Sequence, residues 1–126
     1  MTDFDKLLLN ESPDAVIATT PEGKVLYWSK GAELVFGYTS ADAVGRVLNE
    51  IIVPPDRLDE ERKIFRQAVE IGFSTYESIR YKKDGSLVYV DISSKAVRNA
   101  DGQVEFVLSS KKDVTKAMRT CSALCL

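Results

Sequence analysis

Three glycine-containing turns divide the sequence and constrain the fold more than any other feature. They lie at residues 20–23, 83–86 and 99–102, and each falls between two runs rich in apolar residues. The second and third turns contain Asp-Gly, a strong hairpin signal, because glycine accepts the positive φ that tight turns require. The pattern predicts five strands, at residues 14–19, 24–29, 74–83, 86–97 and 103–114.

The segment between the second and third predicted strands is typical of helices. Its longest helix is expected at residues 56–71, with Asp56 as N-cap and Gly72 as the stop, because apolar residues recur there near helical spacing. Strands grouped around helices, instead of alternating with them, indicate an α+β fold and not a Rossmann-type sheet. Shorter helical segments are expected at 3–10, at 30–36 with Ser29 as cap, at 40–44 starting from Thr39 or Ser40, and at 46–51.

The length and charge of the chain exclude several classes of protein. A chain of 126 residues corresponds to one domain. Its 17 basic and 19 acidic side chains leave no positive excess for a nucleic-acid backbone. The apolar runs are too short to span a bilayer, and Asp3 and Asp5 stand where a signal peptide would be positively charged. We therefore expect a cytoplasmic domain with no nucleic-acid partner and no membrane span.

A set of short motifs, in a consistent order, covers nearly the whole chain. They are GKVLYWSKGAE at 23–33, FGYT at 36–39, Gly45-Arg46, PPDR at 54–57, Tyr76-Glu77, Arg80, KDGS at 83–86 and Asp113-Val114-Thr115. Together they resemble the PAS/PAC (S-box) sensory domains of bacterial signal transduction. The resemblance extends over residues 12–115. It leaves residues 1–11 as an N-terminal helical cap and 116–126 as the start of a signalling helix or a tail.

The resemblance implies a fold and a role. The fold would be α+β and PAS-like (profilin-like): a five-stranded antiparallel sheet with helices packed on one face, enclosing a pocket. The role would be a non-catalytic signal-input module of a larger protein, such as a two-component histidine kinase or a cyclic-dinucleotide enzyme. The expected partners are a second copy, as a homodimer, and a C-terminal effector domain. Asp113 and Thr115 would transmit the signal to the outgoing helix, cap that helix, or do both.

Missing residues narrow the choice of ligand. The chain has no histidine, which excludes haem bound through histidine. Cysteinyl-flavin photochemistry and the chemistry of photoactive yellow protein both need a core cysteine, whereas the two cysteines here are Cys121 and Cys125. Two cysteines four residues apart also lack the further ligands of a metal site, so none is expected. A non-covalent flavin or a small organic ligand remains.

The candidate pocket lies between the helices at 46–51 and 56–71 and the inner face of the sheet. Ligand sites are mostly apolar with a few placed polar groups. Tyr81, Ser94 and Ser110 are predicted to supply those groups, since each alternates onto the face assigned as inner. The same residues would equally form an ordinary core, and both interpretations stay open. The apolar wall residues are predicted to be Leu48, Ile51, Ile52, Phe65, Val69, Ile79, Val90, Ile92, Phe106 and Leu108.

Three functions compete at this point. The first is a ligand-binding, dimerising input module, and the second is a ligand-free interaction module. The third is an enzyme with an α+β cavity, of the ketosteroid isomerase kind. The chain begins its predicted core with two strands, whereas that fold usually begins with helices. Without histidine it also cannot form a Ser/His or Cys/His pair.

The last two predicted strands are apolar on both faces, so the outer face of the sheet is expected to be covered by residues 3–10 or by a partner subunit.

Overall fold

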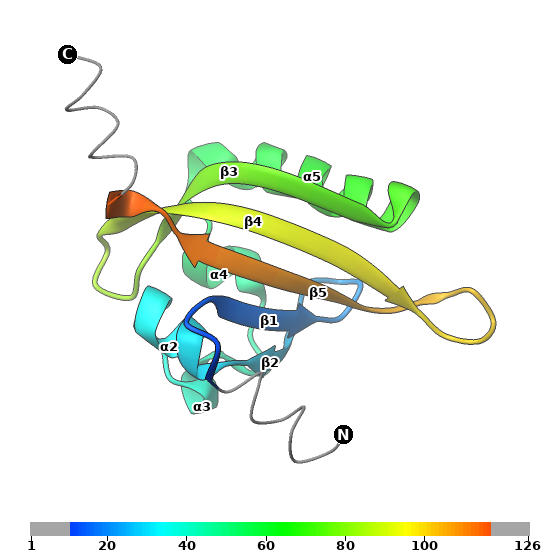
Figure 1. Cartoon of the computed structure of the whole chain (residues 1–126), viewed down its shortest axis with the longest axis horizontal. Coiled ribbons are helices and arrows are strands. Elements are labelled where there is room, and N and C mark those ends of the chain that lie inside the picture. The colour runs from blue at the N-terminus through cyan, green and yellow to red at the C-terminus, as the bar shows by residue number, and fades with distance from the viewer. Residues whose placement is uncertain (1–10, 117–126) are drawn as a thin grey trace.

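The computed structural model describes residues 11–116 and shows one antiparallel sheet with helices on one face (Figure 1). The strand order is β2-β1-β5-β4-β3, so the first and last strands lie side by side in the middle. This confirms the predicted fold class. The strands are β1 (Ala15–Thr19), β2 (Val25–Trp28), β3 (Phe73–Tyr81), β4 (Leu87–Arg98) and β5 (Val104–Asp113).

The helices form the segment between β2 and β3. They comprise α2 (Lys30–Phe36), α3 (Ser40–Ala43), α4 (Leu48–Ile52), the 3-10 turn η1 (Pro55–Arg57) and α5 (Leu58–Ile71). Figure 1 shows α5 lying along β3 and β4, with α4 beneath the middle of the sheet. Within residues 11–116, none of these helices is long and apolar enough to cross a membrane.

Two glycines close the predicted hairpins. Gly85 and Gly102 have φ of 86° and 82°, a region that other residues rarely adopt. The N–H of Gly85 donates to the carbonyl of Lys82 at 3.0 Å, and that of Gly102 donates to the carbonyl of Asn99 at 3.0 Å. These turns make β3, β4 and β5 antiparallel neighbours, as the sequence predicted.

The start of α2 is fixed to β1 by one hydroxyl. The Ser29 Oγ accepts from the backbone N–H of Ala32 at 3.1 Å, as an N-cap does, and from that of Val16 at 2.9 Å. A Cβ on Gly31 would lie 2.0 Å from the carbonyl oxygen of Asp14, so only glycine fits this close approach. The predicted cap is therefore confirmed, and it also joins the helix to the sheet.

The predicted start of α5 is wrong by two residues. The prolines lead into η1 instead, and Arg57, not Asp56, occupies the N-cap position, with no side-chain capping bond. Proline fits the first position of a short helical turn. The acidic residues 59–61 lie in the first turn of α5, where they interact favourably with the positive end of the helix dipole. The predicted stop is confirmed, because Gly72 has φ of 106° and donates to the carbonyl of Ala68.

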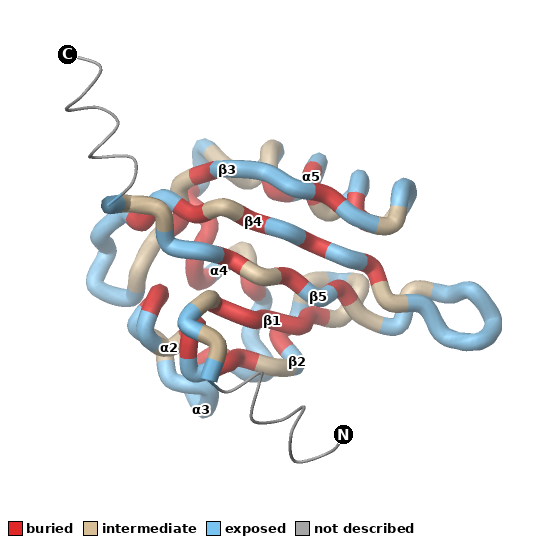
Figure 2. The backbone as a smooth tube through the Cα atoms, in the orientation of Figure 1, coloured by how far each residue is buried: buried red, intermediate tan, exposed pale blue. Residues whose placement is uncertain are grey.

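The apolar core lies under β1, β2 and the start of β4, where buried positions alternate with exposed ones along β4 (Figure 2). Trp28 is 3% exposed, and its indole N–H donates to the carbonyl of Tyr38 at 2.9 Å. Its ring packs near those of Phe36 and Tyr38, at centroid distances of 5.7 and 6.3 Å. These contacts make Trp28 a core residue that anchors the segment after α2.

Candidate ligand site

A cavity of about 540 Å³ opens between α4, α5 and the turn that joins β1 to β2. Its volume lies within the range of small-molecule sites, which is roughly 300–1,000 Å³. Leu48, Phe65, Val69 and Val104 give it apolar walls. Its remaining lining is polar or small: Thr19, Pro21, Glu22, Gly23, Asn49, Glu61, Arg62, Arg66 and Glu70.

The predicted pocket residues on the helices and on β4 lie on the inner side. Leu48, Phe65 and Val69 line the cavity itself. The other members of this set are buried on α4 or on the inner face of β4 and do not line the cavity: Ile51, Ile52, Val90, Ile92 and Ser94. The role of all eight residues in ligand binding stays a prediction.

Two predicted residues of β3 lie on the wrong face. Directly paired residues share a face of the sheet, and Arg80 pairs with the buried Val88. Ile79 and Tyr81 alternate with Arg80 and therefore point to the outer face, away from the cavity. The apolar residues of β3 were predicted to face inward, but the enclosed residue is the charged Arg80.

The same correction applies to β5. Lys111 pairs with Ile92 and Ser109 with Ile17, so these two polar residues face the helices. The three predicted residues of the other parity are on the outer face: Phe106, Leu108 and Ser110. A shift of one residue moves every side chain of a strand to the opposite face, so one wrong assumption misplaced all three.

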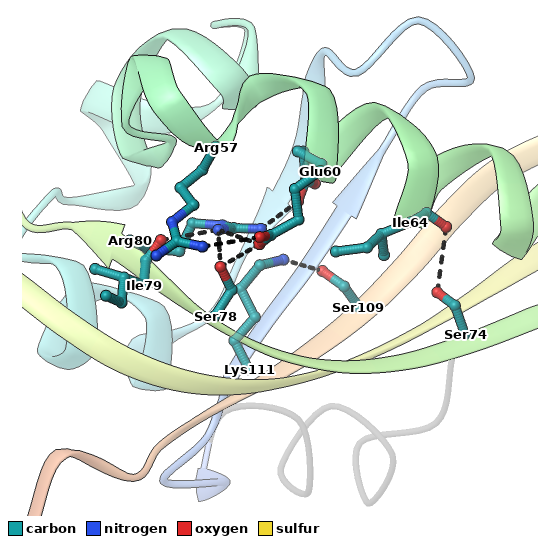
Figure 3. A network of polar contacts seen from close by, with 10 residues as sticks. Arg57, Glu60, Ile64, Ser74, Ser78, Ile79, Arg80, Ser109 and Lys111 are labelled. Atoms are coloured by element: carbon teal, nitrogen blue, oxygen red, sulfur yellow. Dashed lines mark hydrogen bonds and ion pairs between the residues drawn. The ribbon is translucent and has the colours of Figure 1, made fainter. Parts of the chain in front are cut away.

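Arg80 is the centre of a buried polar cluster between α5 and the sheet (Figure 3). We call the set Glu60, Glu61, Ser78, Arg80, Ser109 and Lys111 the inner polar cluster. The Arg80 side chain is 0% exposed. Its Nη2 donates to Glu61 Oε2 at 2.5 Å, and its Nη1 donates to Ser78 Oγ at 2.9 Å and to the carbonyl of Ile79 at 2.8 Å. Among the described residues, its Nε has no acceptor.

Glu60 connects the cluster to the solvent edge. It accepts from Ser78 Oγ and from Arg57 Nη1, the latter at 3.1 Å. Burial alone would raise the pKa of Glu60, but the hydrogen bonds from Ser78, Tyr76 and Arg57, with the charge of Arg80, outweigh it and hold that pKa below its usual value. The hydrogen bond to Glu60 raises the pKa of the Tyr76 hydroxyl. Glu60 is therefore an ionised acceptor at neutral pH.

Lys111 is the second buried cation of the cluster. It is 2% exposed, and its Nζ donates to Ser109 Oγ at 2.6 Å. Burial lowers the pKa of Lys111 to about 8, although the carboxylate of Glu61 acts in the opposite direction. The charge of Arg80 lowers it further. The ammonium is thus held in a site that solvates it poorly.

The inner polar cluster was not predicted from the sequence, although α5 contains one signal for it. Glu61 lies on the same buried stripe of α5 as Ile64 and Ala68, at helical spacing. A carboxylate at a core position of a helix predicts a buried cation facing it. No comparable signal marks Arg80 or Lys111, because long cations are common at exposed positions of strands.

Asp113 and Thr115 lie where β5 leaves the sheet. The Thr115 Oγ1 accepts from the backbone N–H of Tyr89 at 3.1 Å, and Asp113 Oδ1 accepts from the N–H of Thr115 at 2.9 Å. The N–H of Val114 donates to the carbonyl of Tyr89 at 2.9 Å. These bonds tie the exit of β5 to β4, and transmission of a signal through them stays a prediction.

Several predictions fall outside the described residues. They are the helix at 3–10, the tail beyond residue 116, and any role of Cys121 and Cys125. The structure therefore neither supports nor contradicts them.

Comparison with known proteins identifies the family. A family model described as the PAS fold matches residues 3–114, so the chain belongs to the PAS family. PAS domains are sensory or regulatory modules that do not catalyse reactions, and this chain is accordingly a sensory or regulatory module and not an enzyme.

Solved structures share the fold. A PAS domain of a protein from Colwellia psychrerythraea has a TM-score of 0.83 and 24% identity, over 90% of this chain and 96% of that one. An RNA-binding light-oxygen-voltage receptor has a TM-score of 0.79 and 21% identity, over 91% of this chain and 33% of the receptor. The PAS domain of the fruit-fly ELK potassium channel has a TM-score of 0.72 and 20% identity, over 91% of this chain and 99% of that one.

One relative is similar in sequence. An uncharacterized protein of Azorhizobium caulinodans is 31% identical over 67 residues, which are 53% of this chain and 9% of that protein. The chain thus spans about a tenth of the relative that it matches.

Proposed function

We propose that this domain is the signal-input module of a larger signalling protein and binds a small ligand in the cavity beside α5. The observation that carries the proposal is the cavity of about 540 Å³, which combines apolar walls with convergent polar groups. The output would belong to a histidine kinase of a two-component system or to a cyclic-dinucleotide enzyme. The length of the Azorhizobium relative is in keeping with such a parent.

The ligand would be a small organic molecule or a non-covalent flavin. Phe65 and Val69 supply an apolar wall on α5, and Asn49 supplies an amide that can donate and accept at a ring edge. Both kinds of ligand are compatible with these residues.

A route from the cavity to the output passes through β5. Glu61 lines the cavity and interacts electrostatically with Lys111, which lies two residues before Asp113 on the same strand. A ligand that shifts Glu61 would change the forces on the end of β5. The bonds of Asp113 and Thr115 at that end would pass the change to the segment that follows.

A second function, a ligand-free interaction module, is favoured by the outer face of the sheet. Leu87, Tyr89 and Leu108 are exposed there, although apolar side chains gain by burial. A second copy of the chain that packs on this face would give the homodimer expected from the sequence.

One experiment separates the two functions. The purified domain is examined by absorption spectroscopy and by native mass spectrometry over a range of concentrations. For a ligand-binding domain, we expect a mass larger than that of the bare chain, or an absorption band of a flavin. A bare mass at every concentration, together with a concentration-dependent dimer, would contradict ligand binding and support the interaction module.

A further inference from the structure

Two buried cations of the inner polar cluster have donors without acceptors. An ammonium group has three N–H donors, but Lys111 has one hydrogen-bond acceptor among the described residues, the hydroxyl of Ser109. Within residues 11–116, the Nε of Arg80 has no acceptor. A buried charge is strongly unfavourable unless it is paired and hydrogen-bonded. The unsatisfied donors of Lys111 and Arg80 could therefore bind a further hydrogen-bond acceptor.

The charges of the cluster and its edge do not balance. Inside the cluster, Arg80 and protonated Lys111 are matched by Glu60 and Glu61, and Arg57, whose side chain is 37% exposed at the edge, adds one positive charge. The exposed rim of the cavity does not supply the missing charge, because its two arginines are matched by two glutamates: Arg62, Arg66, Glu22 and Glu70. Arg80 and Lys111 therefore need an anionic partner at the position of Glu61 for the enclosed charges to balance.

Glu61 lines the cavity and interacts with both cations. Its Oε2 accepts from Arg80 Nη2 at 2.5 Å. The side chain of Lys111 runs toward Ser109, which pairs with Ile17, and the next inner residue of β1 is Thr19, another residue of the cavity wall. A group that took the place of the Glu61 carboxylate would lie beside Arg80 and interact electrostatically with Lys111.

We propose that the cavity binds a small amphipathic carboxylic acid whose carboxylate replaces that of Glu61 beside Arg80 and Lys111. The apolar body of the acid lies against Leu48, Phe65 and Val69. This inference rests on the proposed function, because it names the ligand class for the same cavity. A carboxylate fits since the cluster already accommodates one at this position, and charge-assisted bonds to arginine are the strong ones. Glu61 then acts as an internal competitor that holds the site closed without ligand.

A matched pair of probes tests the charge requirement. Binding of 4-phenylbutyrate and of its uncharged amide is measured by isothermal titration calorimetry and by NMR shifts at pH 7. The two probes share an apolar body and differ in the charged group. We expect the acid to bind at least about tenfold more tightly, since hydrogen bonds between ionised partners discriminate by about that factor or more.

Three variants locate the effect. Lys111→Met is expected to weaken binding of the acid by about tenfold and to leave the amide unchanged, because it removes a cation and keeps the length of the side chain. Glu61→Gln is expected to strengthen binding of the acid, because it removes the competing charge. Lys112→Met is the control: Lys112 is the next residue of β5, exposed and outside the cavity lining, and its loss should change affinity by less than about twofold.

The outcomes separate this inference from the proposed function. Equal binding of acid and amide overturns the carboxylate specificity and leaves a ligand cavity in place. An unchanged affinity for the acid in Lys111→Met overturns the assignment to the cluster. Binding of neither probe also overturns the inference, and the mass spectrum of the purified domain then decides whether the cavity holds another ligand. If Glu61→Gln does not fold, the probe pair and Lys111→Met decide alone.

Discussion

Lys111 makes the stability of the domain depend on pH in an unusual direction. Its pKa is about 8 in the folded protein, against 10.5 for an ordinary lysine. Between these two values the unfolded chain binds more protons, so the folded state gains stability as the pH rises. Relative to Lys111→Met, we expect the free energy of unfolding of the wild type to increase by about 2 kcal/mol from pH 7 to pH 9.5. Urea denaturation at the two pH values measures this difference.

A neighbouring lysine provides the control. Lys112 is the next residue of β5 and is exposed, so Lys112→Met should follow the wild type at both pH values. All other titratable groups are shared by the wild type and Lys111→Met, so their contributions cancel in that comparison. An identical pH dependence in wild type and Lys111→Met would show that Lys111 keeps ordinary proton affinity and is solvated.

Individual residues of the site were only partly predictable from sequence. Helical spacing placed Phe65 and Val69 on the cavity side of α5 because that helix has one apolar stripe. In β5, apolar residues such as Leu108 stand at one parity and Lys111 at the other, so hydrophobic alternation selected the wrong face. Lys111 faces inward, where it interacts with Glu61 of α5 and lies near Arg80 of β3. The sequence of β5 alone does not contain these contacts with other elements.

Ser29 is the residue on which the position of α2 most depends. Its hydroxyl is the acceptor for two backbone N–H groups, those of Ala32 and Val16, and Ser29 is 1% exposed. Ser29→Ala leaves both donors buried without a partner. We expect a loss of about 2–4 kcal/mol in the free energy of unfolding, measured by chemical denaturation.

The cap of α3 offers a matched comparison. Thr39 accepts a single bond, from Asp42 N at 3.2 Å, at an exposed position. Thr39→Ala should therefore cost about 1 kcal/mol or less, since water replaces the lost acceptor. Similar losses in the two variants would mean that the bond from Ser29 to β1 contributes nothing beyond an ordinary cap.

At the level of elements, prediction succeeded where the signal is local. The cap at Ser29, the stop at Gly72 and the hairpin at Gly85 each depend on a few adjacent residues, and all three are present. The start of α5 was misplaced because Pro54-Pro55 is compatible both with an N-cap at Asp56 and with a preceding 3-10 turn. Packing of the segment on the rest of the fold decides between these, and local sequence does not record it.

The whole molecule presents two different faces of one sheet. The inner face is covered by helices and contains the polar cluster, whereas the outer face has exposed apolar side chains on β4 and β5. Ile79, Tyr81 and Phe106 are half-buried beside them. These three residues therefore do not belong to the cavity and lie on the surface proposed for the homodimer. Ligand and partner would then act on opposite faces of the same strands.

This arrangement predicts which apolar residue controls self-association. Leu108 is 36% exposed on the outer face, and Leu108→Glu would place a charge, and its symmetry mate, in the proposed interface. We expect the dimer dissociation constant to rise by about tenfold or more, measured by analytical ultracentrifugation. Leu34→Glu is the control, because Leu34 is 82% exposed on α2 and away from the sheet. A wild type that stays monomeric at every concentration, or a dimer weakened equally by both variants, would rule out the outer face as the interface.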